Sequence, residues 1–336
     1  MFTINNLESA KSAAKKISNR LERENIKISH SLSLELISAV IGHRNWNITS
    51  FELSKKQNLC ENLFGNRKKV TEVILENTVQ HLSKENSILD NICRLIIKVI
   101  PNLLANDIVG VQAITTPIGA VQTLRIGYTK SHKIICKLLE ETVETKTKQM
   151  SVLFDFKKCK EEEIDVLANE IINQHDQELL WYLHNIADTP SSIYKESEDN
   201  HKELVLLINR QANMIGARTR RGVGNWIVVS PTILTFIESS GFLSKTPNER
   251  KSKKYVGALS SGIDVYCDPY ANDSILVGYN GNTPEDSPVI YSPYLPILPG
   301  DQNGLYTQYG FTEIQKSQQF FGDAKDYITS IKIQKF

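Results

Sequence analysis

Three arginines, Arg218, Arg220 and Arg221, form the densest group of side chains that could carry out chemistry in this chain. A guanidinium group binds phosphate through its paired N–H donors. It also stabilises the last turn of a helix, where the carbonyl end is negative, by about 0.3–1 kcal/mol. Three roles therefore stay open for these arginines: stabilising a helix end, contacting a second subunit, or binding nucleic acid.

The arginines lead into Gly222-Val223-Gly224, which has two of the three glycines of a dinucleotide-binding loop but follows no predicted strand. The Walker loop pattern G-x-x-x-x-G-K-[ST] does not occur in the sequence. Glycine after an amphipathic run is typical of a helix end, because glycine tolerates the positive φ that is needed there. We predict a helix stop and a turn here, and no nucleotide cofactor.

Metal-binding and hydrolytic patterns are also missing from the sequence. Asp264, Asp268 and Asp273 lack the spacing of an EF-hand loop, and Asp268-Pro269 is more typical of a turn after a strand. The motifs HExxH and GxSxG do not occur. His175 lies on the apolar side of a helical pattern, so we expect a hydrogen-bonded core histidine. A cysteine nucleophile stays open, but we expect no metal, no cofactor and no catalysis.

The bulk composition is that of an ordinary globular protein. The chain has 336 residues, enough for two domains and a small third one. Its net charge of +1 creates no general attraction to nucleic acid or to an anionic membrane. The five cysteines are scattered and form no CxxC, which favours a reducing cytosolic environment. We find neither an apolar leader nor a long apolar run, so we expect no signal peptide and no membrane span.

The N-terminal part of the chain is electrostatically distinct. Residues 1–68 hold 11 Lys and Arg against 6 Asp and Glu, whereas the remainder holds 28 against 32. Apolar residues at helical spacing predict a small helical module at 1–56, followed by a polar linker at 57–69. The module could be a helix-turn-helix DNA reader, although Ala39 and Gly42 are three residues apart where that motif uses four. It also resembles a helical module found beside glyoxalase-type domains.

Further along the chain, one long helix and then a change to strands are predicted. Apolar residues recur every three or four positions from Ile164 to Ile186, so we expect the longest helix there. A second helix should span His201–Arg221, followed by a buried strand at Trp226–Val229 and a helix that begins at Pro231. Later strands are expected at Ile263–Cys267, Ile275–Tyr279, Val289–Tyr291 and Tyr327–Ile333. Helices first and strands late indicate an α+β fold.

Five sequence blocks occur in an order that carries a family resemblance. They are IPNLLANDIVGVQ (Ile100–Gln112), ARTRRGVGNWIVVSP (Ala217–Pro231), DVYCDPYA (Asp264–Ala271), VGYNG (Val277–Gly281) and YSPYLPI (Tyr291–Ile297). Together they resemble the major capsid protein family of T-even-type tailed bacteriophages. The resemblance implies a Hong Kong 97-type capsid fold, with a peripheral domain that contains a long spine helix and with an axial domain.

The same resemblance implies how the chain is divided. Residues 70–200 would hold the N-arm, a shortened extended loop and the peripheral domain, with Ile164–Ile186 as its spine helix. Residues 201–299 would form the axial domain, and residues 300–336 would return to the peripheral domain. The family carries a long extended loop, which reaches over a neighbouring subunit, and an inserted domain. Here Ser131 to Glu140 alone joins the two flanking stretches.

The function implied is that of a structural subunit of a phage or prophage capsid, which self-assembles into pentamers and hexamers that enclose DNA. It would be found in the virion after assembly in the bacterial host cytoplasm. Its partners would be copies of itself and other capsid or scaffold proteins, with packaged DNA contacted indirectly and no membrane. Two alternatives remain: a reduced or domesticated capsid-like protein that forms no closed shell and interferes with assembly, or a nucleic-acid-binding protein acting through its N-terminal module.

The resemblance also indicates where subunits would touch, because it places two of the five blocks around the symmetry axis. Arginine and tyrosine are enriched in protein interfaces. We therefore expect subunit contacts at six residues: Arg218, Arg220, Arg221, Tyr291, Pro293 and Tyr294. For the last three this expectation assumes that the YSPYLPI block is exposed.

Overall fold

A computed structural model describes residues 66–81, 86–128, 134–151, 160–187, 192–195, 201–245, 248, 251–271, 274–299, 304–315, 317 and 320–334, together with Lys15. The chain divides into two units, Met1–Gly65 and Asn66–Phe336. Apart from Lys15, the predicted module at 1–56 lies outside the described residues, as does the linker up to residue 65. A helix at residues 66–81 begins within the predicted linker and belongs to the second unit.

The helices of the second unit confirm the expected long helix. In chain order the further helices are α4 (Asn86–Val99), η1 (Ile100–Asn102), α5 (Ala105–Ile108), α6 (Glu161–Ile186), α7 (His201–Thr219), α8 (Pro231–Ser239) and α9 (Ala324–Tyr327). With 26 residues, α6 is the longest helix that the structure describes. Three glutamates occupy its first turn, and Glu163 accepts a hydrogen bond from the Lys160 backbone N–H at 2.8 Å. None of the described helices is long and apolar enough to cross a membrane.

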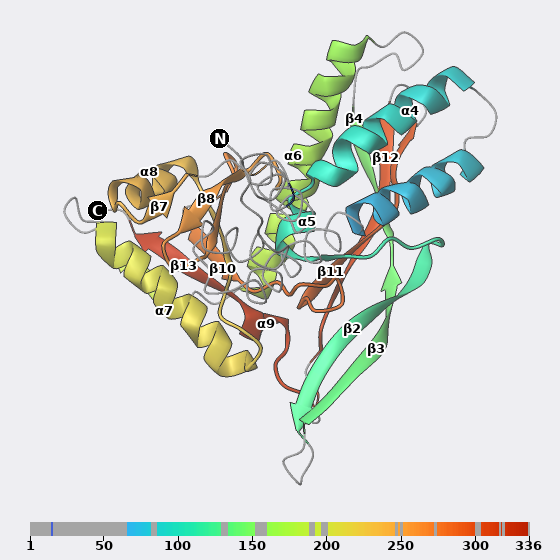
Figure 1. Cartoon of the computed structure of the whole chain (residues 1–336). Helices are drawn as coiled ribbons and strands as arrows, with labels where there is room; N and C mark the ends of the chain where they lie inside the picture. Colours follow the sequence, from blue (N-terminus) through green and yellow to red (C-terminus); the bar gives the residue numbers. More distant parts are fainter. Residues whose placement is uncertain are drawn as a thin grey trace, which may run out of the picture. The chain divides into compact units, whose positions relative to one another are not determined.

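The strands that the structure describes form three sheets (Figure 1). The seven-stranded sheet has the order β5 (Ser192–Lys195), β13 (Ile328–Gln334), β10 (Ser274–Gly278), β6 (Trp226–Val229), β9 (Asp264–Cys267), β8 (Tyr255–Leu259) and β7 (Leu243–Ser244). The four-stranded sheet has the order β1 (Gly110–Val111), β11 (Val289–Pro299), β12 (Gly304–Glu313) and β4 (Lys146–Ser151). The remaining two strands, β2 (Ile118–Tyr128) and β3 (Ile134–Glu144), form a hairpin. The expected α+β class is confirmed.

The strand β6 is buried on both faces, and this explains its uninterrupted apolar sequence. Trp226 and Val228 belong to the apolar cluster that also contains α4, α6 and residues of β11 and β12. Ile227 and Val229 belong to a second cluster, formed with α7 and α8 on the opposite face of the seven-stranded sheet (Figure 1). The predicted start of α8 at Pro231 is also confirmed, with Ser230 as its N-cap.

The sheet order crosses the domain boundaries that the resemblance implied. Residues of β11 were expected in the axial domain, but β11 pairs with β12 in the four-stranded sheet. Residues of β13 were expected to return to the peripheral domain, but β13 pairs with β10 and β5 in the seven-stranded sheet. The pairings of β13 join residues far apart in the chain, which local sequence patterns do not reveal.

The hairpin β2–β3 occupies the place where a short connection was expected. Its register runs without a break from the pair Ile118–Glu144 to the pair Tyr128–Ile134. Eleven residues in each strand make a ribbon roughly 36 Å long. The ribbon projects away from both larger sheets (Figure 1). The segment Ser131 to Glu140 is therefore more than a connection, since strand β3 begins within it at Ile134 and continues to Glu144.

Candidate functional site

The arginine group lies where α7 ends, but the helix ends differently from the prediction. Arg220 adopts the left-handed conformation with φ of 54°, so the expectation that Gly222 or Gly224 would supply the positive φ is wrong. Its backbone N–H donates to the Gly216 carbonyl at 2.9 Å. Gly222 is required for another reason, since a Cβ there would lie 2.7 Å from a ring carbon of Tyr279. Close packing, and not a positive φ, accounts for this glycine.

Arg221 points into the protein and connects three segments. Its side chain is 7% exposed and pairs with the carboxylate of Asp286, which lies between β10 and β11. Its other terminal nitrogen donates to the Leu124 carbonyl of β2 at 3.4 Å. Burial raises the pKa of Asp286, while Arg221 and a hydrogen bond from Tyr279 act in the opposite direction. The expected contact of Arg221 with a second subunit is thus replaced by contacts within the chain.

These contacts belong to a larger set of hydrogen bonds along the edge of β2 that faces away from β3. The Gln112 side chain bonds both backbone groups of Gln122, at 2.7 and 2.9 Å. The Leu124 N–H donates to the Glu285 carbonyl at 2.8 Å, and the Ile126 carbonyl accepts from the Phe321 N–H at 3.0 Å. We call the group formed by Arg221, Tyr279 and Asp286 the clamp.

The hairpin has two unlike faces, because side chains alternate along each strand. The inner face carries Val121, Thr123 and Arg125, all buried, and the Arg125 guanidinium donates to the carbonyls of Gln315 and Gly322, both at 2.9 Å. The outer face has an apolar stretch toward the far end of the hairpin, formed by the pairs Leu124–Leu138 and Ile126–Cys136 and by Ile134, whereas Gln122, Glu140, Thr142 and Glu144 make the rest of that face more polar. On that face Ile134 is 71% exposed and Leu138 is 56% exposed.

The six residues expected at subunit contacts fall into two groups. Arg218 and Arg220 are exposed, and the Arg220 guanidinium lies 5.3 Å from the centre of the Phe321 ring. Tyr291, Pro293 and Tyr294 are buried, so the assumption that this block is exposed is wrong. The reason is that other elements cover both faces of β11: Tyr291 belongs to the cluster of α4 and α6, and Tyr294 belongs to the cluster that contains Val121 and Val143 of the hairpin.

The middle of α6 holds a buried polar group that sequence reasoning described in part. His175 is 5% exposed and its ring centre lies 4.7 Å from that of Tyr309, as expected of a core histidine. Neither ring nitrogen has a hydrogen-bond partner among the described residues, so the expected hydrogen bond is missing. Burial lowers the pKa of His175 to about 4, and the nearby Lys148 contributes in the same direction.

The neighbouring Asp176 ties α6 to the seven-stranded sheet. It accepts a hydrogen bond from the Leu104 backbone N–H at 2.9 Å and pairs with Lys254 at 2.9 Å. Lys254 also lies 3.5 Å from Asp268, which follows β9. Burial raises the pKa of Asp176 to about 6, with Lys254 acting in the opposite direction. Asp268 is thus occupied by an ion pair, and the described residues contain no group of three or more metal-ligating side chains.

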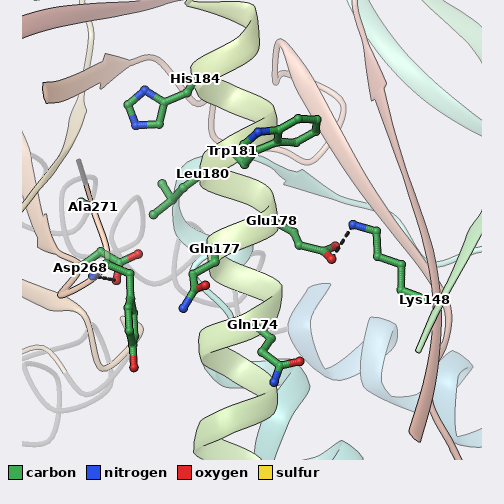
Figure 2. A pocket seen from close by; sticks show the side chains of 10 residues that line it. Lys148, Gln174, Gln177, Glu178, Leu180, Trp181, His184, Asp268 and Ala271 are labelled. Atoms are coloured by element: carbon green, nitrogen blue, oxygen red, sulfur yellow. Dashed lines mark hydrogen bonds and ion pairs between the residues drawn. The ribbon is translucent and has the colours of Figure 1, made fainter. Parts of the chain in front are cut away.

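The exposed side of α6 borders a surface hollow of about 620 Å³ (Figure 2). Glu178 and Lys148 form an ion pair on one side of it, and Asp268 lies on the opposite side of the helix (Figure 2). Trp181 lines the same hollow and is 67% exposed. The lining groups resemble a polar protein surface and form no arrangement of nucleophile, base and oxyanion donor.

Comparison with known families identifies matches in two parts of the chain. The family model described as major capsid protein Gp23 matches residues 87–162 and 152–302. This span contains nearly all of α4, the hairpin, α6, α7, β6 and β11. A second family model, described as a glyoxalase superfamily protein, matches residues 2–81.

Curated relatives are similar to a shorter part of the chain. The major capsid protein of Salmonella phage ViI is 35% identical over 106 residues, which are 29% of this chain and 24% of that protein. The major capsid protein of Vibrio phage KVP40 is 33% identical over 110 residues, covering 30% and 21% respectively. That of Enterobacteria phage T4 is 28% identical over 111 residues, covering 30% and 21%. The matched segment thus spans about a quarter of the length of these relatives.

Solved structures with a similar arrangement have low sequence identity to this chain. A virus-like particle from Pyrococcus furiosus has a TM-score of 0.40 at 9% identity, covering 72% of this chain and 98% of that one. A structure from Microbacterium phage Oxtober96 has a TM-score of 0.43 at 10% identity, covering 69% and 91%. The capsid of Ralstonia phage GP4 has a TM-score of 0.42 at 10% identity, covering 66% and 86%.

Proposed function

Because the chain belongs to the major capsid protein Gp23 family, we propose that it is a structural subunit of a phage or prophage capsid shell. In this proposal the subunits associate into pentamers and hexamers around DNA and are found in the virion after assembly in the host cytoplasm. Many weak contacts, repeated by symmetry, add up to a stable container. The observation that carries the proposal is the family match over residues 87–302.

The outer face of the hairpin supports self-association on physical grounds. A two-stranded ribbon is marginally stable in water, and its apolar side chains gain about 25 cal/mol per Å² when they are buried. The inner face of this hairpin packs on the subunit, whereas Ile134 and Leu138 on the outer face stay exposed. We propose that a second copy of the chain covers the outer face. Contacts of this head-to-tail kind form closed rings when the rotation between subunits closes.

Arg218 and Arg220 remain proposed subunit contacts, because both are exposed at the end of α7. An exposed ion pair contributes about 0–1 kcal/mol, so such a contact matters through repetition around a ring. Tyr291, Pro293, Tyr294 and Arg221 support assembly indirectly in this proposal, by holding the strands and the hairpin in place.

The test uses the purified full-length protein, light scattering and negative-stain microscopy. The wild type should form shells or rings as its concentration is raised. Leu138→Asp should abolish these assemblies while the monomer keeps its melting temperature within a few degrees, because Leu138 is exposed in the monomer. Thr142→Asp is the matched control, since it adds the same charge on the same strand and face outside the apolar pairs.

A wild-type protein that stays monomeric at high concentration would argue against the proposal. Closed shells would support the conventional capsid subunit. Open sheets or rings that never close would favour the reduced, capsid-like alternative.

A further inference from the structure

We propose that the clamp of Arg221, Tyr279 and Asp286 sets the angle at which the hairpin leaves the subunit, and thereby the curvature of the assembled product. This inference rests on the proposed self-association through the outer face. It makes Arg221 a positioning residue, which acts on a neighbouring subunit through the hairpin and not by touching it.

The covalent attachment of the hairpin leaves its direction open. The two strands join the rest of the chain near Pro117 and Thr145, whose backbone groups share a hydrogen bond of 2.9 Å. A ribbon held at one end can pivot there. At roughly 36 Å in length, a tilt of about 10° would move its tip by roughly 6 Å. Contacts along β2 are therefore needed to determine the direction. Gln112, Glu285 and Phe321 bond its edge, and Arg125 bonds two carbonyls on the inner face. The clamp is the contact that links this edge to a buried ion pair.

The clamp supplies such contacts from the side of the seven-stranded sheet. Arg221 follows α7, which packs on that sheet, and Tyr279 directly follows β10, which is one of its strands. The Arg221 guanidinium reaches Asp286 and the Leu124 carbonyl together. Because a guanidinium is planar and its donors form a rigid fork, two acceptors bound at once fix an orientation. The position of the hairpin is thus coupled to that sheet.

The chemistry of the clamp favours orientation over stability as its role. An ion pair that is buried loses its hydration, so apolar side chains of similar volume often stabilise a protein equally well. The Arg221 side chain is 7% exposed and that of Asp286 is 22% exposed. A charged pair in this position supplies directional bonds that apolar packing does not. Buried polar groups can specify one geometry among several, and a hairpin pivot is a place where that matters.

Loosening the clamp should change the shape of the assemblies more than the affinity between subunits. The outer face would still bind a second copy if the clamp were loosened, because the apolar side chains are unchanged. The angle between neighbours would vary, however, and a head-to-tail contact whose rotation does not close gives open assemblies. We therefore expect a broad distribution of particle diameters where the wild type has a narrow one.

The experiment combines Arg221→Gln with Asp286→Asn in the full-length protein, so that both charges are removed and hydrogen-bonding groups remain. Particle diameters are measured by electron microscopy, and hydrogen exchange is followed at the Leu124 and Phe321 amides. We expect broader or open assemblies, with exchange at these two amides at least tenfold faster and with other amides of the fold unchanged. Association should still be abolished by Leu138→Asp.

Arg210→Gln is the matched control, since Arg210 is an exposed arginine of α7 to which neither proposal gives a role. It should leave both exchange and diameter unchanged. If the double variant does not fold, Arg221→Lys replaces it, because lysine keeps the charge but lacks the two-acceptor fork. Wild-type diameters together with wild-type exchange at Leu124 would overturn the inference.

The two proposals fail in distinguishable ways. A wild-type protein that never assembles contradicts the proposed self-association. Hydrogen exchange at Leu124 in that monomer then still decides whether the clamp holds the hairpin.

Discussion

The inner and outer faces of the hairpin β2–β3 differ in how far the rest of the chain covers their side chains. On the inner face the side chains of β2 are buried, and Arg125 has two carbonyl acceptors within the chain. On the outer face Ile134 and Leu138 stay largely exposed. The same two strands therefore serve the fold on one side and, in the proposed function, a neighbouring subunit on the other. A difference of this kind separates stability from assembly, and substitutions on the two faces should separate them too.

The largest expected effect comes from a charge on the inner face. Val121 is 1% exposed and packs in a cluster with Val143, Ile290 and Tyr294. Val121→Asp should cost several kcal/mol, because a carboxylate without a partner would be buried there. The melting temperature from calorimetry should fall by more than about 10 °C. A loss as small as that of Leu138→Asp on the outer face would remove the distinction between the faces.

The next largest effect is the pH dependence of stability, which comes from two buried residues of α6, His175 and Asp176, and not from the hairpin. The folded pKa of His175 is about 4, below the usual 6.5, so its contribution to stability is lost as pH falls from 6.5 to about 4. Asp176 acts oppositely, because its folded pKa of about 6 exceeds the usual 3.8 and favours the folded state in acid. Each contribution is about 3 kcal/mol, so the two largely offset each other.

His175→Gln should expose this compensation. Relative to the wild type, the variant should gain up to about 3 kcal/mol in free energy of unfolding between pH 6.5 and pH 4. Urea unfolding at a series of pH values measures the difference. A difference that stays constant over this range would contradict the prediction.

A smaller effect is expected from the polar contact of the inner face. Arg125→Leu leaves the carbonyls of Gln315 and Gly322 without the donors of this buried arginine. We expect a loss of about 1–3 kcal/mol in the free energy of unfolding, measured by denaturant titration. Arg125→Lys should recover part of the loss, since one ammonium can bond one of the two carbonyls. Equal losses in both variants would mean that packing and not hydrogen bonding holds this face.

The smallest effect on the monomer is expected at the exposed end of α7. Arg218→Glu should change the free energy of unfolding by about 1 kcal/mol or less, through the charge at the helix end. Light scattering should nevertheless detect weaker association if Arg218 contacts a neighbour. Arg221→Glu is expected to differ sharply, because it places a second carboxylate beside Asp286 inside the clamp. Similar melting temperatures for the two variants would show that Arg221 is less buried in solution.

Local patterns predicted the elements that depend on neighbours in the sequence. The period of the apolar residues predicted α6, and the amphipathic run predicted α7 to within two residues. The uninterrupted apolar run predicted the buried strand β6, and Pro231 predicted the start of α8. Each of these signals comes from backbone geometry and burial along one short segment, so no distant contact is needed to read it.

The misjudged elements depend on contacts between distant segments. YSPYLPI has the composition of an exposed aromatic and proline-rich segment, but Tyr291 packs in the cluster of α6, and Tyr294 packs with Val121 and Val143 of the hairpin. Arg221 resembles Arg218 in the sequence, and its different role follows from the position of Asp286, which lies 65 residues away. The first half of β3 was mistaken for a short connection, because the polar and charged residues of this strand alternate weakly with apolar ones.

The sequence by itself determined the family, the α+β class, the long helix and the absence of recognisable catalytic motifs. These follow from residue identity and spacing along the chain, which the unfolded chain already carries. Tertiary structure decided which arginine is buried, which tyrosines are covered and which face of the hairpin stays exposed. The physical reason is that burial and charge pairing belong to pairs of segments brought together by folding. The free energy of a side chain therefore depends on neighbours that its own sequence position does not specify.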